Sequence, residues 1–220
     1  MEAMKNVINN IIRSVLTALY QPFWAAILLA TVSMFIFLYA KEHGWNINNF
    51  LPNVLRVWWN EFRQSRTFRR AFLLVFYTTM ILFRTILNRE IWFDPLGKIM
   101  EGWGLYDANG ELTTEAIENF MLFVPFTILL LWTFRKQLLG KIVSLKNVIW
   151  ISIKVVGIFS LVIEFLQVLI HVETFQLSDL FYNTLGGVCG GVIYYYWRNK
   201  DRYEYNTGSY NTVITKLYWE

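Results

Sequence analysis

The chain has 220 residues, of which 55% are hydrophobic, 18% are aromatic and only 16% are charged. Because a soluble domain usually carries about 25% charged residues, this composition argues against an ordinary soluble domain. The formal net charge of +4 comes with no nucleic-acid-binding motif, and a single cysteine, Cys189, excludes an internal disulfide and a cysteine-cluster metal site.

Residues 1–20 are expected to form an amphipathic helix on the membrane surface. Lys5 and Arg13 lie among apolar residues, while asparagines such as Asn9 and Asn10 interrupt the apolar core that a secretory signal peptide needs. We therefore expect no signal peptide in this segment.

Apolar runs of near-transmembrane length dominate the rest of the chain, since a spanning helix needs roughly 20 mostly apolar residues. They cover residues 22–39, 71–87, 119–134, 148–170 and 179–197. The pattern predicts an all-α fold, a polytopic transmembrane bundle of about five spans. After the first run, residues 53–70 place aromatic side chains among arginines, directly behind Pro52. This stretch predicts an interfacial amphipathic helix with a basic face.

The charge of the connecting segments predicts the orientation, because Lys and Arg are retained on the cytoplasmic side. Residues 41–70 hold six basic residues and residues 135–147 hold four, whereas residues 88–118 hold seven acids. Residues 171–179 hold two acids and no Lys or Arg. The basic segments and the C-terminus are therefore expected inside, and the acidic segments outside.

Three parts of the chain follow from this organisation. Residues 1–70 comprise the amphipathic segment, the first span and the basic interfacial helix. Residues 71–197 form a four-span domain, and residues 198–220 form a cytoplasmic tail.

Polar residues of the predicted spans gather on the outer side of this topology. The candidates for a binding site are Arg84, Asn119, Glu164, Gln167, Asp179 and Asn183. An ionisable group at mid-depth costs about 2.5–3.5 kcal/mol on insertion scales, and such groups usually face a partner inside the bundle. We expect Arg84 to pair with Glu164, or failing that with Asp179.

Several of these residues also have simpler explanations. Asp179 suits the N-cap of the last span, and Asn119 suits the start of the third. Arg84 can extend to the outer headgroups, and His171 can lie in an exposed loop. Glu164 and Gln167 are the hardest to explain in this way, because both lie within a span.

The last predicted span also carries a pattern of small residues. Gly186, Gly187, Gly190 and Gly191 form two overlapping GxxxG motifs, which allow a neighbouring helix to approach closely. Pro125 is expected to bend the third span.

The motifs of known catalytic sites are absent from the sequence. It contains no HExxH, P-loop, GxSxG or dinucleotide-binding fingerprint. With only His43 and His171, a multi-histidine site is excluded, and we expect neither a metal nor a cofactor. If the protein is an enzyme, Glu164 and Asp179 are the candidates for an acid/base pair.

Residues 118–130 and 160–191 resemble the VanZ family of bacterial membrane proteins. The matching positions are Asn119, Phe123, Pro125, Phe126, Glu164, Gln167, Asp179, Asn183 and Gly186. Arg84 is similar to the basic residue that ends the family's first conserved span, so the resemblance covers about residues 71–197. The sequence departs from the pattern at Thr127, which replaces a glycine, and lacks an arginine common before the aspartate.

The resemblance implies a multi-pass protein of the bacterial plasma membrane with a link to resistance against teicoplanin-like and other lipid-tailed glycopeptides. It supplies no reaction. The first hypothesis is therefore a non-enzymatic protein whose outer polar site binds a lipid-linked cell-wall precursor or a lipoglycopeptide among membrane lipids. The second is a membrane enzyme acting on a lipid-linked cell-wall intermediate, and the third is a transporter or channel. No nucleic-acid partner is expected.

Overall fold

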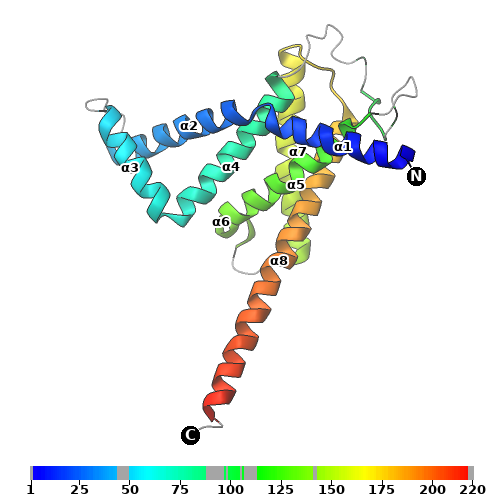
Figure 1. Cartoon of the computed structure of the whole chain (residues 1–220). Coiled ribbons are helices and arrows are strands. Elements are labelled where there is room, and N and C mark those ends of the chain that lie inside the picture. Colours follow the sequence, from blue (N-terminus) through cyan, green and yellow to red (C-terminus); the bar gives the residue numbers. More distant parts are fainter. Residues whose placement is uncertain are drawn as a thin grey trace.

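The computed structural model describes residues 2–43, 50–87, 97, 99–104, 106, 113–140 and 143–217. These residues are almost entirely helical, which confirms the all-α prediction (Figure 1). The helices are α1 (Glu2–Tyr20), α2 (Phe23–His43), α3 (Phe50–Gln64), α4 (Arg66–Leu82), the π-helical turn η1 (Phe83–Leu87), α5 (Glu115–Thr133), α6 (Arg135–Leu139), α7 (Leu145–Leu169) and α8 (Leu177–Leu217).

Helices α5, α7 and α8 form the centre of the bundle, with α4 packed against α5 and α2 packed against α4. The chain runs up α4, down α5, up α7 and down α8, so the end of α4, the start of α5, the end of α7 and the start of α8 meet at one end (Figure 1). The core between them contains Ile81, Phe123, Val156 and Ile163, all about 1% exposed or less. We call the shared end of these helices the polar end, because buried polar side chains gather there.

Glycines on two faces of α8 allow it to pack closely against two helices at once. A Cβ atom at Gly186 or Gly190 would collide with backbone carbonyl oxygens of α5. On the adjacent face, a Cβ at Gly187 would lie 2.6 Å from the Val156 side chain of α7, and one at Gly191 would collide with another α7 side chain. The close approach expected from the GxxxG motifs is therefore present, and each motif serves a different neighbour.

The basic stretch 53–70 is divided between two helices. The hydroxyl of Ser65 accepts a hydrogen bond from the Phe68 N–H at 3.1 Å and caps α4. The Arg69 guanidinium donates to the carbonyls of Phe62 at 3.2 Å and Arg63 at 2.8 Å, which are among the last of α3. These carbonyls have no partner within their own helix, so the same short segment ends α3 and begins α4. The expected interfacial helix is thus shorter than the pattern indicates.

Two helices, α5 and α7, are long and apolar enough to cross a membrane by length and composition, and α2 contains a shorter apolar segment, Phe23–Leu38. Five spans remain a prediction. Helix α5 continues through Pro125, whose missing N–H leaves the carbonyl four residues earlier without its usual helical donor. Helix α8 has 41 residues, which at 1.5 Å per residue gives about 60 Å, roughly twice the thickness of bilayer hydrocarbon. It therefore extends well beyond the bundle (Figure 1).

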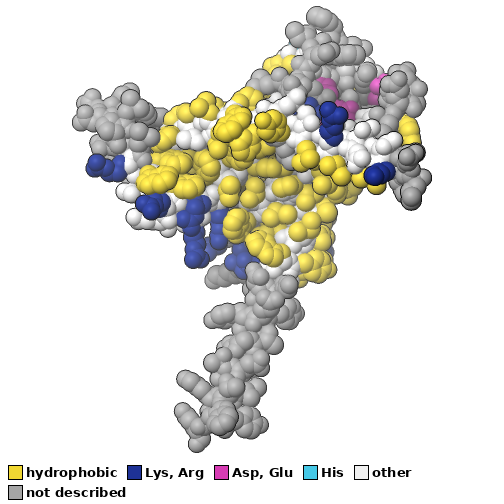
Figure 2. All heavy atoms as spheres, in the orientation of Figure 1, with side chains coloured by type: hydrophobic (Ala, Val, Ile, Leu, Met, Phe, Trp, Pro, Cys, Tyr) yellow, Lys and Arg dark blue, Asp and Glu magenta, His cyan; other side chains and the backbone are white. Residues whose placement is uncertain are grey.

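The molecular surface is apolar over a broad band. Figure 2 shows hydrophobic side chains across the helices, with many Lys and Arg along the lower edge, and with Asp and Glu beside further Lys or Arg side chains near the upper right. The lower edge corresponds to the α3–α4 junction, α6 and the start of α7, where Arg66, Lys136 and Lys146 are exposed. On this face the apolar band thus separates a basic end from the polar end, where acidic and basic side chains lie together.

Candidate functional site

Buried polar side chains from several helices converge at the polar end. The side chains of this region that are at least nine-tenths buried include Thr85, Glu118, Asn119, Glu164, Gln167, Thr174, Gln176, Ser178, Asp179 and Asn183. All six residues singled out in the sequence lie here, although Arg84 is half-buried. The structure arranges them in pairs that differ from those expected.

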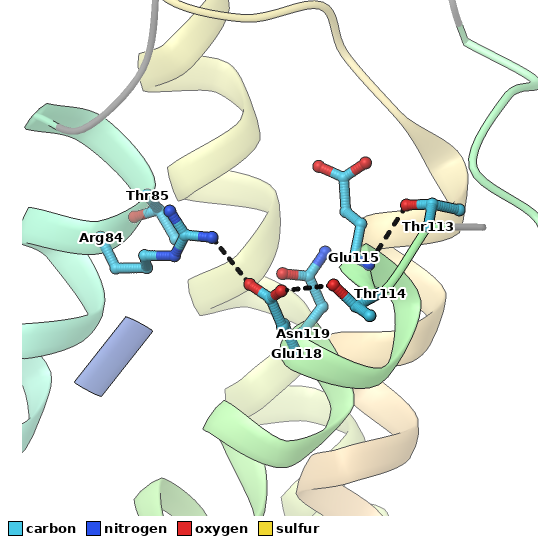
Figure 3. A pocket seen from close by; sticks show the side chains of 7 residues that line it. All are labelled: Arg84, Thr85, Thr113, Thr114, Glu115, Glu118 and Asn119. Atoms are coloured by element: carbon cyan, nitrogen blue, oxygen red, sulfur yellow. Dashed lines mark hydrogen bonds and ion pairs between the residues drawn. The ribbon is translucent and has the colours of Figure 1, made fainter. Parts of the chain in front are cut away.

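Arg84 pairs with Glu118. The π-helical turn η1 carries Arg84 to the first turn of α5, where its Nη2 donates to Glu118 Oε2 at 2.7 Å (Figure 3). The Thr114 hydroxyl donates to the other carboxylate oxygen of Glu118 at 2.7 Å and also lies 3.1 Å from the Ser14 hydroxyl of α1. Glu118 therefore links η1 to the start of α5 and to Thr114, and Thr114 contacts α1.

The expected pair between Arg84 and Glu164 is not formed, and this prediction is wrong. Glu164 lies on the face of α7 that meets the segment before α8, and its Oε2 accepts a hydrogen bond from the Gln176 N–H at 3.0 Å. Arg84 instead faces the start of α5. The pairing of Arg84 with Glu118 was not predicted, because the third span was expected to start only at Glu118 and Asn119, whereas α5 begins at Glu115 and includes Glu118 in its first turn.

Gln167 joins α7 to two other segments. Its side-chain Nε2 donates to the Thr85 carbonyl at 2.8 Å and to Glu173 Oε2 at 2.8 Å. The Thr85 carbonyl lies in η1, where the helix ends and backbone acceptors need partners from elsewhere. π-helical turns occur frequently at functional sites. Gln167 thus holds η1 and the α7–α8 connection against each other.

His171 closes the C-terminal end of α7. It adopts φ = 58°, its N–H donates to the Val168 carbonyl at 3.2 Å, and the Val172 N–H donates to the Gln167 carbonyl at 3.1 Å. This pair of bonds is the Schellman arrangement that closes a helix with one left-handed residue. The side chain of His171 is exposed, as expected for a residue of an exposed loop.

The simpler explanations of Asn119 and Asp179 do not fit the observed helix starts. Helix α5 begins four residues before Asn119, and α8 begins at Leu177, so Asp179 lies inside the first turn and not at the N-cap. A carboxylate there is favoured by the helix dipole. Asn183, one turn later, donates from Nδ2 to the Ser160 hydroxyl at 2.9 Å and links α8 to α7.

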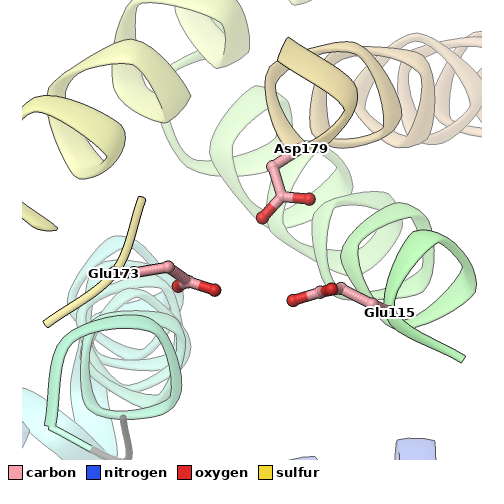
Figure 4. Close-up of side chains that lie close together, drawn as sticks. All are labelled: Glu115, Glu173 and Asp179. Carbon is pink, nitrogen blue, oxygen red and sulfur yellow. The ribbon is translucent and has the colours of Figure 1, made fainter. Parts of the chain in front are cut away.

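Three carboxylates from separate elements face one another beside this network. Glu115 of α5, Glu173 of the α7–α8 connection and Asp179 of α8 each place an oxygen within 4.8 Å of the others (Figure 4). We call Glu115, Glu173 and Asp179 the acidic triad. Only Asp179 was singled out from the sequence, because nothing in the spacing of the other two indicates that the fold brings them together.

Two polar cavities open at this end and share Thr114. The first, of about 230 Å³, is lined by Arg84, Thr85, Thr113, Thr114, Glu115, Glu118 and Asn119 (Figure 3). The second, of about 380 Å³, is lined by Asn10, Arg13, Ser14, Thr17 and Thr114. Helix α1 therefore contributes its polar face to the site, which the sequence assigned only to the membrane surface.

An apolar hollow lies on another side of the same helix turns. It has a volume of about 200 Å³ and is lined by Gly104, Ala116, Ile117, Phe120, Tyr182 and Leu185. The Tyr182 hydroxyl accepts a hydrogen bond from the Gly104 N–H at 3.2 Å. The polar end thus combines polar cavities with an apolar hollow between α5 and α8.

A protein-family model described as VanZ/LLP1 matches residues 23–198. No curated protein and no solved structure matches the chain. The matched region begins at α2, well before residue 71, where the motifs of the sequence first indicated a resemblance. It includes both partners of the Arg84–Glu118 pair and the whole acidic triad, but not α1.

Proposed function

The chain belongs to the VanZ/LLP1 family, and we propose that it is a multi-pass protein of the bacterial plasma membrane whose polar end binds a lipid-linked or lipid-tailed molecule. The observation that carries the proposal is the combination of polar cavities and an apolar hollow at one end of an apolar bundle. A molecule with a polar head and a lipid tail needs both surfaces within a short distance.

The proposed orientation follows from the distribution of charge. Arg66, Lys136 and Lys146 are exposed at the end opposite the polar cavities, and basic residues mark the cytoplasmic side. We assign α2, α4, α5, α7 and α8 as the spans. In this orientation the polar end faces the extracytoplasmic leaflet, and the C-terminus is cytoplasmic.

The polar cavity offers groups that can recognise a headgroup. Arg84 is 24% exposed while Glu118 is 9% exposed, so the guanidinium keeps accessible donors beside its ion pair. Threonine hydroxyls from Thr113 and Thr114 also line the cavity. Arginine presents several donors in a fixed fork, which suits oxygen-rich headgroups or glycopeptide carboxylates.

Binding, rather than acid/base catalysis by Glu164 and Asp179, is favoured by the place of Glu164. It is only 2% exposed, it lines neither polar cavity, and its carboxylate accepts a backbone N–H. A general acid or base must reach the reacting group within hydrogen-bonding distance. The apolar core around Phe123 and Val156 likewise supports a site at one end rather than a polar path across the bundle.

We further propose that this binding contributes to resistance against teicoplanin-like, lipid-tailed glycopeptides. The test compares susceptible bacteria that express the parent protein, Arg84→Gln or the control Lys136→Gln, whose exposed side chain lies at the opposite end. Protein levels in the membrane are matched by immunoblotting, and native lipids that copurify are identified by mass spectrometry.

We expect Arg84→Gln to lose both the protection and the copurified ligand, while Lys136→Gln retains both. If the parent protein neither protects cells nor retains any specific lipid-linked or lipid-tailed molecule, the proposed function is wrong. If Arg84→Gln protects cells and retains the ligand as the parent does, Arg84 takes no part in binding.

A further inference from the structure

We propose that the acidic triad, Glu115, Glu173 and Asp179, binds one divalent cation. This inference concerns a site beside the first polar cavity and does not depend on the identity of the lipid-linked molecule. The side chains come from α5, the α7–α8 connection and α8, and their carboxylates point toward a common centre (Figure 4).

The spacing of the three carboxylates suits a hard cation. Their ligand oxygens all lie within 4.8 Å of one another. Oxygen ligands lie about 2.0–2.1 Å from Mg²⁺ and about 2.3–2.6 Å from Ca²⁺, so two oxygens on opposite sides of an ion are about 4–5 Å apart. One ion can therefore contact all three carboxylates with small side-chain rotations.

The surroundings hold two of the three acids in place. Gln167 donates to Glu173 Oε2 at 2.8 Å, and hydrogen bonds of this kind commonly orient metal-binding carboxylates. Asp179 lies in the first turn of α8, where the helix dipole favours its charged form. The charged form is the one that binds a cation.

Two buried amides provide an independent indication of a bound, hydrated ligand. Asn119 is four residues after Glu115, and Asn183 is four residues after Asp179, so each amide shares a helix face with one acid of the triad. They are 6% and 3% exposed. Asn119 Nδ2 and Asn183 Oδ1 nevertheless have no hydrogen-bond partner within the part of the chain that the structure describes.

A hydrated ion beside Glu115 explains the unpartnered amide nitrogen of Asn119. Asn119 lines the same 230 Å³ cavity as Glu115 (Figure 3), and liquid water occupies about 30 Å³ per molecule, so several waters fit. Water bound to a cation donates its hydrogens to further waters, and the oxygen of such a further water also accepts from an amide N–H. Mg²⁺ in particular keeps several of its waters when it binds to proteins. The unpartnered Asn119 Nδ2 is therefore accounted for by water around the ion.

The donor set indicates which cations bind. All of the proposed protein ligands are oxygens, which select Mg²⁺, Ca²⁺ or Mn²⁺ over metals that prefer nitrogen or sulfur. This proposal differs from the expectation of no metal, because that expectation considered only histidine and cysteine ligands.

The test uses the full chain, purified in detergent, stripped with EDTA and given Mn²⁺ alone, without lipid or antibiotic. Electron paramagnetic resonance measures bound Mn²⁺, and thermal unfolding is followed with Mn²⁺, Mg²⁺ or Ca²⁺. We expect about one bound Mn²⁺ per chain and a midpoint that rises by several degrees, because a ligand that binds only the folded state stabilises it.

The variants separate this site from nonspecific binding to acids. Glu173→Gln keeps an oxygen for the Gln167 hydrogen bond and should fold, but should lower Mn²⁺ affinity at least tenfold; Glu115→Gln should do the same. Glu61→Gln, in α3 at the opposite end, should bind as the parent does. If the parent binds no Mn²⁺, or if both triad variants bind it with unchanged affinity, the proposal is wrong. If the parent binds Mn²⁺ but retains no lipid-linked or lipid-tailed molecule, the proposed function is contradicted and this site is not.

Discussion

Arg84 Nη2 and Glu118 Oε2 lie 2.7 Å apart and connect the π-helical end of α4 to the first turn of α5. Removing one partner leaves the other charge partly buried without its counterion, which costs about 1–3 kcal/mol. We expect Arg84→Met and Glu118→Gln each to lower the unfolding midpoint in detergent, and the double variant to lose clearly less than the sum. The double-mutant cycle measures this coupling, and strictly additive effects would show that the pair contributes nothing to stability.

The close contact of α8 with α5 predicts a strong position effect for glycine substitutions. Gly190→Ala would place a methyl group against the Val124 carbonyl, so the helices must separate and thermal stability should fall by about 1–3 kcal/mol. Gly157→Ala is the matched control, because its Cβ would meet the Thr184 hydroxyl at an ordinary 3.6 Å and alanine favours a helix. The two variants should be compared by thermal unfolding in one detergent; similar losses would contradict the close-packing explanation.

The left-handed conformation of His171 predicts a stabilising substitution. A residue with a Cβ atom pays about 1–2 kcal/mol in this region of backbone space, whereas glycine does not. Part of this gain is offset by the greater backbone freedom of glycine in the unfolded chain. We expect His171→Gly to raise the unfolding midpoint slightly and to leave ligand binding unchanged. A clear decrease in either quantity would mean that the imidazole has a role of its own.

The proposed orientation predicts a pattern of chemical labelling on intact cells. In a Cys189→Ala background, a cysteine at Met100, which is 72% exposed near the polar end, should react with an impermeant thiol reagent. One at the exposed Gln137 of α6 should react only after the membrane is made permeable. The reverse result would place the polar end in the cytoplasm and contradict the extracytoplasmic site.

Local pattern and family resemblance were enough to predict the helices and many of the residues at the polar end. Asp179 and Asn183 could be identified because polar residues one turn apart are unusual in an apolar helix. Glu118 could not be identified as the partner of Arg84, because the pairing depends on how η1 meets α5 and the chain between them is long. Glu173 was likewise counted only as a loop charge, since its place beside Asp179 depends on how the chain turns between α7 and α8.

The contact of α1 with the polar end was not predicted, for a different physical reason. Its amphipathic pattern is compatible with a membrane surface and with a protein surface, and the contact of Ser14 with Thr114 distinguishes the two. Amphipathicity predicts that one face is polar, but not which surface that face contacts.

The last prediction concerns Glu164, whose buried carboxylate accepts the Gln176 N–H at 3.0 Å. Glu164→Gln retains an oxygen that can accept this bond, so the variant should fold, keep most of its stability and protect cells as the parent does. Glu164→Leu leaves the Gln176 N–H without an acceptor in a buried position, which costs about 1–3 kcal/mol. Unfolding midpoints and glycopeptide susceptibility should therefore separate the two variants, with Glu164→Leu impaired in both measurements. If Glu164→Gln is stable but abolishes protection, then the charge of Glu164 takes part in function, and the acid/base hypothesis regains support over a purely positioning role.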